Sequence, residues 1–502
     1  MRRGEVALGA VAGLVAGGVT LAVGELVAAF VRPAAAPVIA VGNRVIVLTP
    51  ESIKRWATRE FGTNDKSVLL TGIYLLLGAC AVVVGILAVR WLWAGVVGVA
   101  ALGGFAVYCA LTAPGHHTGD AVPAILGAIA GVIALRGLLR SAETSASRRR
   151  FLGASAALAG GALAVGFGGR ALQHARHDVS KQRAALKLPP PASPAPVASG
   201  ADLGKGAVPF DTPNARFYRI DTVLTFPQID PKHWRLRIHG QVERELTLSY
   251  DDLLRRPLVE RWITLTCVSN EIGGNLISNA RFLGVRLADV LREVGIANGA
   301  DQLLARSYDG MTIGSPTAVV MDGRDAMLAI GMNGEPLPIA HGFPVRMVVP
   351  GLYGYVSACK WIVDLEATTF ADAQAFWVQG GWAAQGPIRL ASRIDTPQSG
   401  AKLPVGGAVP IAGIAWDQHV GVSRVEVQVD DGEWQQARLA AVPSTDTWRQ
   451  WVLPWTVGPA GQHTIRVRAY DAYGIVQDPQ HRDPFPSGAT GYHQIGVTAQ
   501  AP

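Results

Sequence analysis

The chain has 502 residues, too many for one ordinary domain, and 49% of them are hydrophobic whereas only 17% are charged. Its net charge of +7 does not indicate nucleic-acid binding, because no basic block with interleaved aromatic residues occurs. Four cysteines do not indicate a disulfide scaffold, and two of them, Cys80 and Cys109, lie in apolar stretches. The composition predicts several domains, one of them embedded in a membrane.

Five apolar stretches in the first third of the chain could cross a bilayer, since about twenty apolar residues suffice for a span. They are Glu5–Val31, Val68–Val89, Trp91–Ala113, Ala121–Leu139 and Phe151–Gly169. The first four predict a four-helix transmembrane region over residues 1–145. Glu25 is the only acid inside the first span, where it either faces another helix or lies near an interface. The polar loop that follows, residues 52–67, could hold an interfacial helix.

The basic residues predict the orientation of these spans. Arg2 and Arg3 begin the chain, Arg90 joins the second and third spans, and Arg148–Arg150 precede the fifth. With the N-terminus inside, five crossings place all of these arginines on the cytoplasmic side and everything after about residue 170 outside. The first outside loop also carries basic residues, so the rule is obeyed on balance.

The fifth span, within residues 146–172, begins with SRRRFLG at Ser147–Gly153 and continues in an alanine- and glycine-rich run. That order resembles a twin-arginine export signal placed inside the chain, and an ordinary positive-inside anchor is the alternative. Both interpretations predict a retained anchor. Residues 173–208 follow as a linker whose KLPPPASPAPVASG segment is expected to be extended and unable to pack.

Two further domains are predicted after the linker. Over residues 209–388, short strands such as WRLRIHG mix with short helices such as SYDDLLRR, which indicates an α+β domain. Over residues 389–502, RVEVQVDDGEW and HTIRVRAYD alternate polar and apolar residues, and Asp431-Gly432 is typical of a hairpin turn. An all-β sandwich of the immunoglobulin type is the natural interpretation.

Cys267 ends a predicted strand in the α+β domain. Trp262, Thr264 and Thr266 alternate with Ile263, Leu265 and Cys267, the period of a half-buried strand, and a helix is predicted from Arg286 to a stop at Gly295. A thiol that faces inward beside the glycine-containing loop VSNEIGGN is placed to bind a soft metal. Such a cysteine is also often a small core residue, the interpretation we adopt for Cys359.

Several separate sequence motifs in the second half of the chain resemble those of a known enzyme family. TCVSNEIGG, NARFLGVRLADVL, MNGEPLPIAHGFPVRMVVPG and GYVSACKWI occur in the same order as in the sulfite-oxidase family of molybdopterin enzymes, and the chain resembles that family from about Pro209 to Thr498. The resemblance implies a molybdenum–molybdopterin cofactor, with Cys267 as the catalytic metal ligand. It also implies that the C-terminal sandwich is a dimerisation domain, so a homodimer is possible.

The same resemblance implies which residues contact the cofactor. Guanidinium, imidazole, amide and hydroxyl groups would hold the pterin and its phosphate. These residues are Tyr218, Arg219, Asp221, Asn270, Ser307, His341, Arg346, Ser357 and Lys360.

Two departures leave the substrate open. The family's active-site tyrosine segment reads MTIGSPTAV here, with Tyr308 a few residues earlier, and Glu271 and Ile272 occupy the positions of the arginines in the CAGNRR motif. We therefore expect oxygen-atom transfer with a small oxyanion, or reduction of a sulfoxide-type substrate such as oxidised methionine. A non-catalytic interaction module tethered to the membrane is the alternative from another class.

The electron partner is expected to be a separate molecule. The apolar spans contain no histidine, so no haem is predicted, and His116 and His117 lie in the loop after the third span. Membrane lipid and a redox partner are the predicted partners, without nucleic acid. The sequence thus predicts a multi-pass protein of the cell membrane with its catalytic and C-terminal domains outside the cytoplasm.

Overall fold

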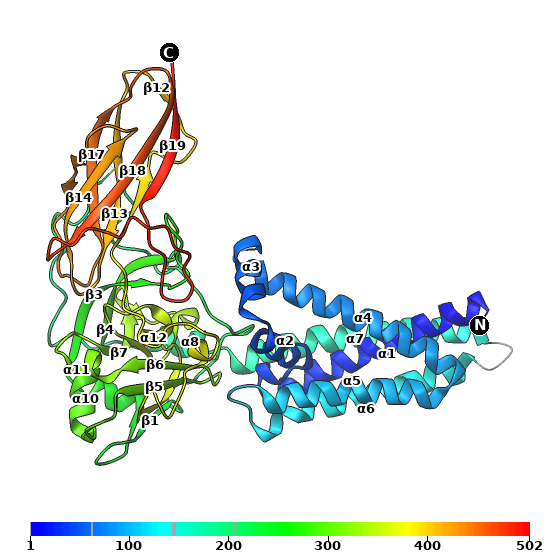
Figure 1. The fold of residues 1–502 in the computed structure, drawn as a ribbon. Coiled ribbons are helices and arrows are strands. Elements are labelled where there is room, and N and C mark those ends of the chain that lie inside the picture. Colours follow the sequence, from blue (N-terminus) through cyan, green and yellow to red (C-terminus); the bar gives the residue numbers. More distant parts are fainter. Residues whose placement is uncertain (1, 62–63, 143–146, 205, 502) are drawn as a thin grey trace. The chain divides into compact units, whose positions relative to one another are not determined.

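The computed structural model describes residues 2–61, 64–142, 147–204 and 206–501 (Figure 1). It contains two compact units. The first holds the chain up to Val179 together with the short segment Asp221–Gln228, and the second holds Ser180–Ile220 and Ile229–Pro502. The predicted domain boundary at 145/146 lies outside the described residues.

The first unit is helical. Five helical stretches among the described residues are long and apolar enough to cross a membrane, as predicted, and they coincide with the five expected positions. The long helices are α1 (Arg3–Ala28), α4 (Asp65–Arg90), α5 (Leu92–Thr112), α6 (Val122–Ala142) and α7 (Ser147–His177). Shorter helices are α2 (Pro37–Leu48) and α3 (Glu51–Phe61), and the latter lies where a helix was expected in the polar loop.

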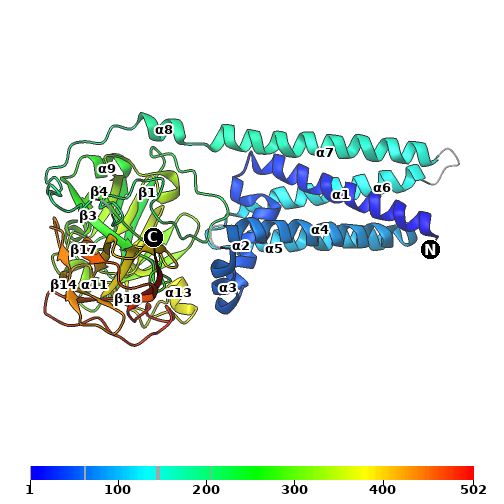
Figure 2. The same ribbon diagram turned by 90° about the horizontal axis from the view of Figure 1, so that it is seen from above.

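Helix α1 is the centre of this unit and packs against α4, α6 and α7 (Figures 1 and 2). Glycines make the approach possible: a side-chain carbon at Gly9 would lie 2.7 Å from the Cα atom of Ile86 on α4, and one at Gly13 or Gly85 would also meet backbone. Small residues let two helix backbones touch, which provides the van der Waals contact that holds apolar helices together in lipid.

Polar contacts join residues at or near the ends of the helices in this unit. Arg32 Nε donates to Asp120 Oδ1 at 2.7 Å, and the Asp120 side chain is 2% exposed. Lys66 pairs with Asp221 of the short segment that belongs to the helical unit. Glu25, whose partner the sequence left open, faces α7 and accepts a hydrogen bond from Gln173 Nε2 at 3.0 Å.

The second unit begins with two sheets and short helices, the α+β arrangement that the sequence predicts. One sheet has the order β2-β1-β10-β5-β6 and the other β3-β4-β7-β8, with β9 paired to β7. The strands of the first are β1 (Arg235–Gly240), β2 (Leu246–Ser249), β5 (Gln302–Ser307), β6 (Thr312–Pro316) and β10 (Ile362–Thr368). Those of the second are β3 (Leu258–Thr266), β4 (Ile277–Arg286), β7 (Met327–Met332), β8 (Glu335–Pro336) and β9 (Arg346–Val348).

Short helices connect these strands. They are α8 (Ser180–Ala185), α9 (Tyr250–Leu254), α10 (Leu287–Val294), α11 (Thr317–Met321), α12 (Gly354–Ser357) and α13 (Phe376–Gln379). The helix predicted from Arg286 is α10, and Gly295 ends it in the left-handed conformation at φ 68°. Glycine adopts this conformation without steric cost, which explains the stop.

Strand β3 is more deeply buried than predicted. The sequence suggested a half-buried strand with Thr264 and Thr266 outward, yet both threonines are 1% exposed. The C-terminal domain covers this face: Trp448 N donates to Thr264 Oγ1 at 2.8 Å, and Gln418 Nε2 donates to Thr266 Oγ1 at 2.8 Å. The expectation of a half-exposed strand is therefore wrong, because a domain more than 140 residues further along supplies the second layer.

The proline–alanine segment also packs, contrary to the prediction. Ser193 forms a parallel bridge with Val259 of β3, and the Ala192 amide donates to the Leu258 carbonyl at 2.8 Å. Trp262 Nε1 donates to the Pro196 carbonyl at 3.1 Å. Proline prevents a regular ladder but leaves carbonyl groups free to accept, so an extended segment can cover a strand edge.

The C-terminal region is a β-sandwich, as predicted. Its sheets have the orders β11-β13-β17-β16 and β12-β19-β18-β14-β15. Its strands are β11 (Ala391–Thr396), β12 (Lys402–Pro404), β13 (Ala408–Trp416), β14 (Val422–Val429), β15 (Gln435–Gln436), β16 (Arg438–Leu439), β17 (Arg449–Thr456), β18 (Gly461–Asp471) and β19 (His493–Gln500). Trp451 is fully buried between the sheets, and the antiparallel pairing of β14 with β15 confirms the hairpin around Asp431-Gly432.

Candidate functional site

Cys267 lies directly after β3, at the start of the predicted loop. Its amide donates to the Leu276 carbonyl at 2.9 Å, and its own carbonyl accepts from the Asn270 amide at 3.1 Å. The Asn270 side-chain oxygen accepts from the Leu276 amide at 2.8 Å. Asn270, predicted as a cofactor contact, therefore closes the loop that carries the thiol.

The sandwich holds the far side of the same loop. Arg393 Nη1 donates to the Gly274 carbonyl at 2.7 Å, and Arg393 Nε donates to Asp395 Oδ1 at 2.7 Å. The His493 ring lies against Gly273, whose φ of 73° requires glycine and leaves no room for a side chain. Burial, together with the charge of Arg393, lowers the pKa of His493 to about 4, so the imidazole is neutral at pH 7.

A second wall of the site comes from the segment before β1 and from the HGFPVR motif. The Phe217 ring stacks on Tyr218 at 5.6 Å and meets the His341 ring edge-on at 5.5 Å. The Tyr218 amide donates to Ser278 Oγ at 3.0 Å, which attaches this segment to β4 beside β3. Burial raises the pKa of the Tyr218 hydroxyl, and the nearby Cys267 sulfur raises it further while Arg346 lowers it.

Arg346 occupies the interior of the site. It is 5% exposed, its guanidinium lies 5.8 Å from the centre of the Phe282 ring, and Nη1 donates to the His341 carbonyl at 3.3 Å. Burial lowers its pKa to about 10, which leaves the group cationic at pH 7. Burial, with Arg346 and Lys360 nearby, lowers the pKa of His341 to about 3, so this imidazole is neutral and can donate or accept a hydrogen bond.

Lys360 contributes a further cation. Its Nζ lies 4.9 Å from the centre of the Trp361 ring and donates to the Ile220 carbonyl at 3.1 Å. Gly342 packs tightly between Arg346 and the Lys360 backbone, since a side-chain carbon there would lie 3.0 Å and 3.1 Å from them, and its φ is 107°. The Arg219 charge is also close enough to His341 to lower its pKa.

Ser357 and Asp221 have other partners. The Ser357 hydroxyl contacts the backbone carbonyl oxygens of Leu352 and Tyr353, both at 3.0 Å, and is fully buried at the end of α12. Asp221 belongs to the helical unit, where Lys66 pairs with it. The structure thus brings Tyr218, His341, Arg346 and Lys360 together. Ser357 lies on α12 beside them, since a side-chain carbon at Gly354 of that helix would lie 3.5 Å from the Tyr218 hydroxyl oxygen.

Buried polar atoms without partners mark the same region. Among the described residues, Arg346 Nε and Ser307 Oγ have no hydrogen-bond partner although both are buried, and Asp309 Oδ1 is in the same condition. Such groups cost free energy unless a ligand satisfies them. Burial raises the pKa of Asp309, and the nearby Lys360 charge opposes this.

The residues present fit a molybdopterin group. Burial raises the pKa of the Cys267 thiol, although hydrogen bonds from Ser269 oppose this, and a bound metal would compensate by favouring the thiolate. Arg346 offers an unpaired guanidinium N–H to a phosphate or pterin oxygen, and Ser307 offers a hydroxyl. Cys359, treated as a core residue, is 1% exposed, and burial raises the pKa of its thiol.

Sequence reasoning missed Asp309, Arg393 and His493. Asp309 follows Tyr308 in a turn, a position that usually indicates only a solvated loop. Arg393 and His493 lie over 100 residues after Cys267, and no local pattern connects them to its loop. Only the packing of the sandwich on the α+β domain could have identified them.

Comparison with known proteins agrees with this geometry. Residues 223–377 match the family described as oxidoreductase molybdopterin binding domain, and residues 391–467 match a bacterial Ig domain. Mitochondrial sulfite oxidase from Mus musculus is 32% identical over 319 residues, which cover 53% of this chain and 57% of the mouse protein. Sulfite oxidase from Gallus gallus is 31% identical over 318 residues, which cover 53% of this chain and 68% of the chicken protein.

One solved structure supports the fold. The sulfane dehydrogenase SoxCD from Paracoccus pantotrophus superposes with a TM-score of 0.50 at 24% identity, over 58% of this chain and 81% of that chain. The chain spans little more than half the length of the mouse relative, 57%. The thiol at the end of β3, its cationic surroundings and these matches lead to one conclusion: the chain belongs to the sulfite-oxidase family of molybdopterin oxidoreductases.

Proposed function

We propose that this protein is a membrane-anchored, molybdopterin-dependent oxidoreductase that exchanges an oxygen atom with a small substrate outside the cytoplasm. The observation that carries the proposal is the buried Cys267 thiol at a strand end, together with the buried Arg346, whose Nε has no hydrogen-bond partner among the described residues. Both groups lie close enough to Tyr218 to shift the pKa of its hydroxyl. Soft sulfur and unsatisfied cationic donors are what a molybdopterin group needs from a protein.

The roles of the residues follow from their contacts. Cys267 would hold the metal, while Tyr218, Arg219, His341, Arg346 and Lys360 would hold the pterin and its phosphate. The bound group would supply two-electron redox chemistry and a site for oxygen-atom exchange. A neutral His341 would orient the group by hydrogen bonding without adding a charge, because its pKa is lowered to about 3.

The anchoring proposal rests on the five apolar helices and on the distribution of arginines. Arg2, Arg3, Arg90 and the basic start of α7 fall on one side if all five helices cross, which the positive-inside rule assigns to the cytoplasm. The second unit then lies outside. The arginines at the start of α7 would serve either as an export signal or as a topological anchor.

A small oxyanion is the substrate class that we favour. The similar proteins from Mus musculus and Gallus gallus are sulfite oxidases, and sulfite is a small oxyanion. Glu271 and Ile272 stand where relatives of the CAGNRR type carry arginines, and this observation favours a sulfoxide-type substrate as the second candidate. A separate electron-transfer partner completes either cycle, and a homodimer formed through the sandwich is part of the same proposal.

Cofactor analysis tests the proposal on the full chain. We expect purified protein to contain about one molybdenum and one pterin per chain, and we expect Cys267→Ser to fold yet lose turnover. Cys359→Ser is the matched control, because we assign this second buried thiol, 1% exposed, to the core. Purified protein without molybdenum would refute the proposed enzymatic activity, and the non-catalytic interaction module would then be the remaining interpretation. Two dye assays separate the substrate classes. An enzyme that oxidises sulfite should reduce an oxidised dye when sulfite is added, whereas a sulfoxide reductase should oxidise a reduced dye when a sulfoxide is added.

A further inference from the structure

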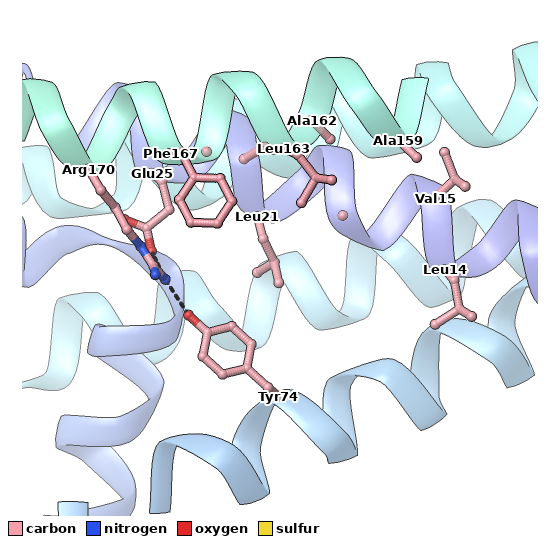
Figure 3. Close-up of a pocket in the computed structure, with 13 residues that line it drawn as sticks. Leu14, Val15, Leu21, Glu25, Tyr74, Ala159, Ala162, Leu163, Phe167 and Arg170 are labelled. Atoms are coloured by element: carbon pink, nitrogen blue, oxygen red, sulfur yellow. Dashed lines mark hydrogen bonds and ion pairs between the residues drawn. The ribbon is translucent and has the colours of Figure 1, made fainter. Parts of the chain in front are cut away.

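The helical unit contains a cavity of 420 Å³ between α1, α4 and α7 (Figure 3). Its size lies within the range of small-molecule sites, roughly 300–1,000 Å³. Apolar side chains form most of the wall and polar groups gather at one end. The lining residues are Leu14, Val15, Gly18, Leu21, Ala22, Glu25, Tyr74, Ala159, Ala162, Leu163, Gly166, Phe167 and Arg170.

The polar end is a connected cluster. Arg170 Nη2 on α7 donates to the Tyr74 hydroxyl oxygen on α4 at 2.6 Å and lies 3.5 Å from Glu25 Oε1 on α1. Gln173 Nε2 donates to the Glu25 carboxylate at 3.0 Å and to its carbonyl at 2.7 Å. Figure 3 shows Glu25, Tyr74 and Arg170 pointing toward one another beside the Phe167 ring. Glu25 is thus paired with polar groups of α7, as an ionisable group in a membrane helix is expected to be.

The cavity is shaped for an elongated molecule. Its lining on α1 runs from Leu14 to Glu25, eleven residues, or roughly 16 Å at 1.5 Å per residue. Arg170 lies twenty residues after Arg150, or about 30 Å along α7, which is the thickness of the hydrocarbon core. In the proposed orientation, the polar cluster therefore lies near the outer surface, and the apolar part extends toward the middle of the bilayer.

The charge of the cluster selects the polar end of the occupant. One cation, Arg170, faces one carboxylate, Glu25, so the cluster carries no net charge. A phosphate would have to lie beside the Glu25 carboxylate, which repels it. Arg170 donates to the Tyr74 oxygen, so the Tyr74 O–H remains able to donate to a ligand. A neutral ligand that bears a carbonyl oxygen fits this arrangement.

We propose that this cavity binds a lipid-soluble quinone or quinol, with the ring at Glu25, Tyr74 and Arg170 and the apolar tail along Leu14, Leu21 and Leu163. A quinone carbonyl would accept from the Tyr74 hydroxyl or Arg170, and a quinol hydroxyl would donate to Glu25. The choice of a redox-active amphiphile rests on the proposed function, since an oxidoreductase needs an electron partner. The binding itself is independent of the reaction at Cys267.

Binding of decylubiquinone to the full chain in phosphatidylcholine nanodiscs tests the proposal without requiring turnover. We expect saturable binding of about one molecule per chain. Gly18→Leu should fill the groove and weaken binding at least tenfold, because a side-chain carbon at Gly18 meets nothing within 4 Å. Gly104→Leu on α5 is the matched control, since its position is equally open and lies outside the cavity. Its affinity should equal that of the wild type.

Tyr74→Phe distinguishes a quinone ring that is hydrogen-bonded to Tyr74 from a phospholipid chain that merely fills the cavity. Loss of one hydrogen bond should weaken binding roughly three- to tenfold, whereas occupancy by a phospholipid chain alone would be unaffected. Equal, non-saturable uptake by wild type and Gly18→Leu would overturn the proposal. So would displacement of decylubiquinone by phosphatidylglycerol from the wild type and Tyr74→Phe alike. Molybdenum content, measured on each variant, reports separately on the proposed function.

Discussion

Replacement of Arg393 by leucine should loosen the loop that carries Cys267. The Arg393 side chain is 9% exposed and links the Gly274 carbonyl to the Asp395 carboxylate, each at 2.7 Å. Its removal leaves a partly buried carbonyl and a carboxylate that is 11% exposed without their cationic partner. Breaking a buried pair of this kind costs about 3–5 kcal/mol, of which the hydrogen bond to the loop accounts for about 1.5–3 kcal/mol.

Hydrogen exchange is the appropriate measurement, because the chain has several domains and a single unfolding midpoint would not describe the loop. A loss of about 1.5–3 kcal/mol corresponds to roughly 10- to 150-fold faster exchange of the amides between Cys267 and Leu276. Molybdenum retention should fall in parallel. Arg466→Leu is the control, because Arg466 pairs with the exposed side chain of Gln494 on the outer part of the sandwich.

The double variant Arg393→Leu with Asp395→Leu distinguishes the two contacts. It also removes the Asp395 carboxylate, which the single variant leaves without its cationic partner. The stability of the sandwich should therefore recover, while the loop amides still exchange quickly. Unchanged exchange between residues 267 and 276 in the single variant would refute the reasoning, since the guanidinium would then serve only Asp395.

Three further outcomes follow from the geometry. Burial lowers the pKa of His341 to about 3 and of His493 to about 4, so the stability that neutral imidazoles provide is present above pH 6.5 and is lost as the pH falls toward these values. At pH 5 the loss is about 2 kcal/mol for each group. His493→Gln should therefore flatten the loss of hydrogen-exchange protection of the amides between Cys267 and Leu276 from pH 7 to 5. Ser307→Ala should leave the apo protein's melting temperature unchanged or higher but reduce cofactor retention, because this buried hydroxyl lacks a partner; equal retention would contradict the site. Gly13→Leu should prevent folding, because its side chain would collide with the α4 backbone where α1 meets α4. Gly72→Leu points into open space, so this variant should give a normal monodisperse peak in size-exclusion chromatography in detergent.

Local patterns sufficed for the elements with a strong period. The five apolar helices, the strand that ends at Cys267 and the helix stop at Gly295 were all predictable, because length, alternation and a glycine at the C-terminus are local signals. Strand β4 was missed. Nine of its ten residues are at least partly buried, so both faces are covered, and the polar–apolar alternation of Asn279–Phe282 stops at Leu283-Gly284-Val285.

Contacts between distant segments could not be predicted. The partner of Glu25 lies 148 residues away on α7, and a single acid in an apolar span does not specify which helix it faces. The family resemblance identified Tyr218, His341, Arg346 and Lys360, which the fold does bring together. It also suggested Asp221, which Lys66 holds in the helical unit.

The extended segment along β3 has a consequence for how the second unit can be produced alone. β3 is the last strand of its sheet, and a bare edge invites pairing with another chain. Ser193 shields its beginning, and the Asp446 carbonyl accepts from the Thr264 amide at 2.9 Å near its end. A soluble fragment that starts at Pro209 would lack the first of these shields and should aggregate, whereas one that starts at Lys187 should remain monodisperse.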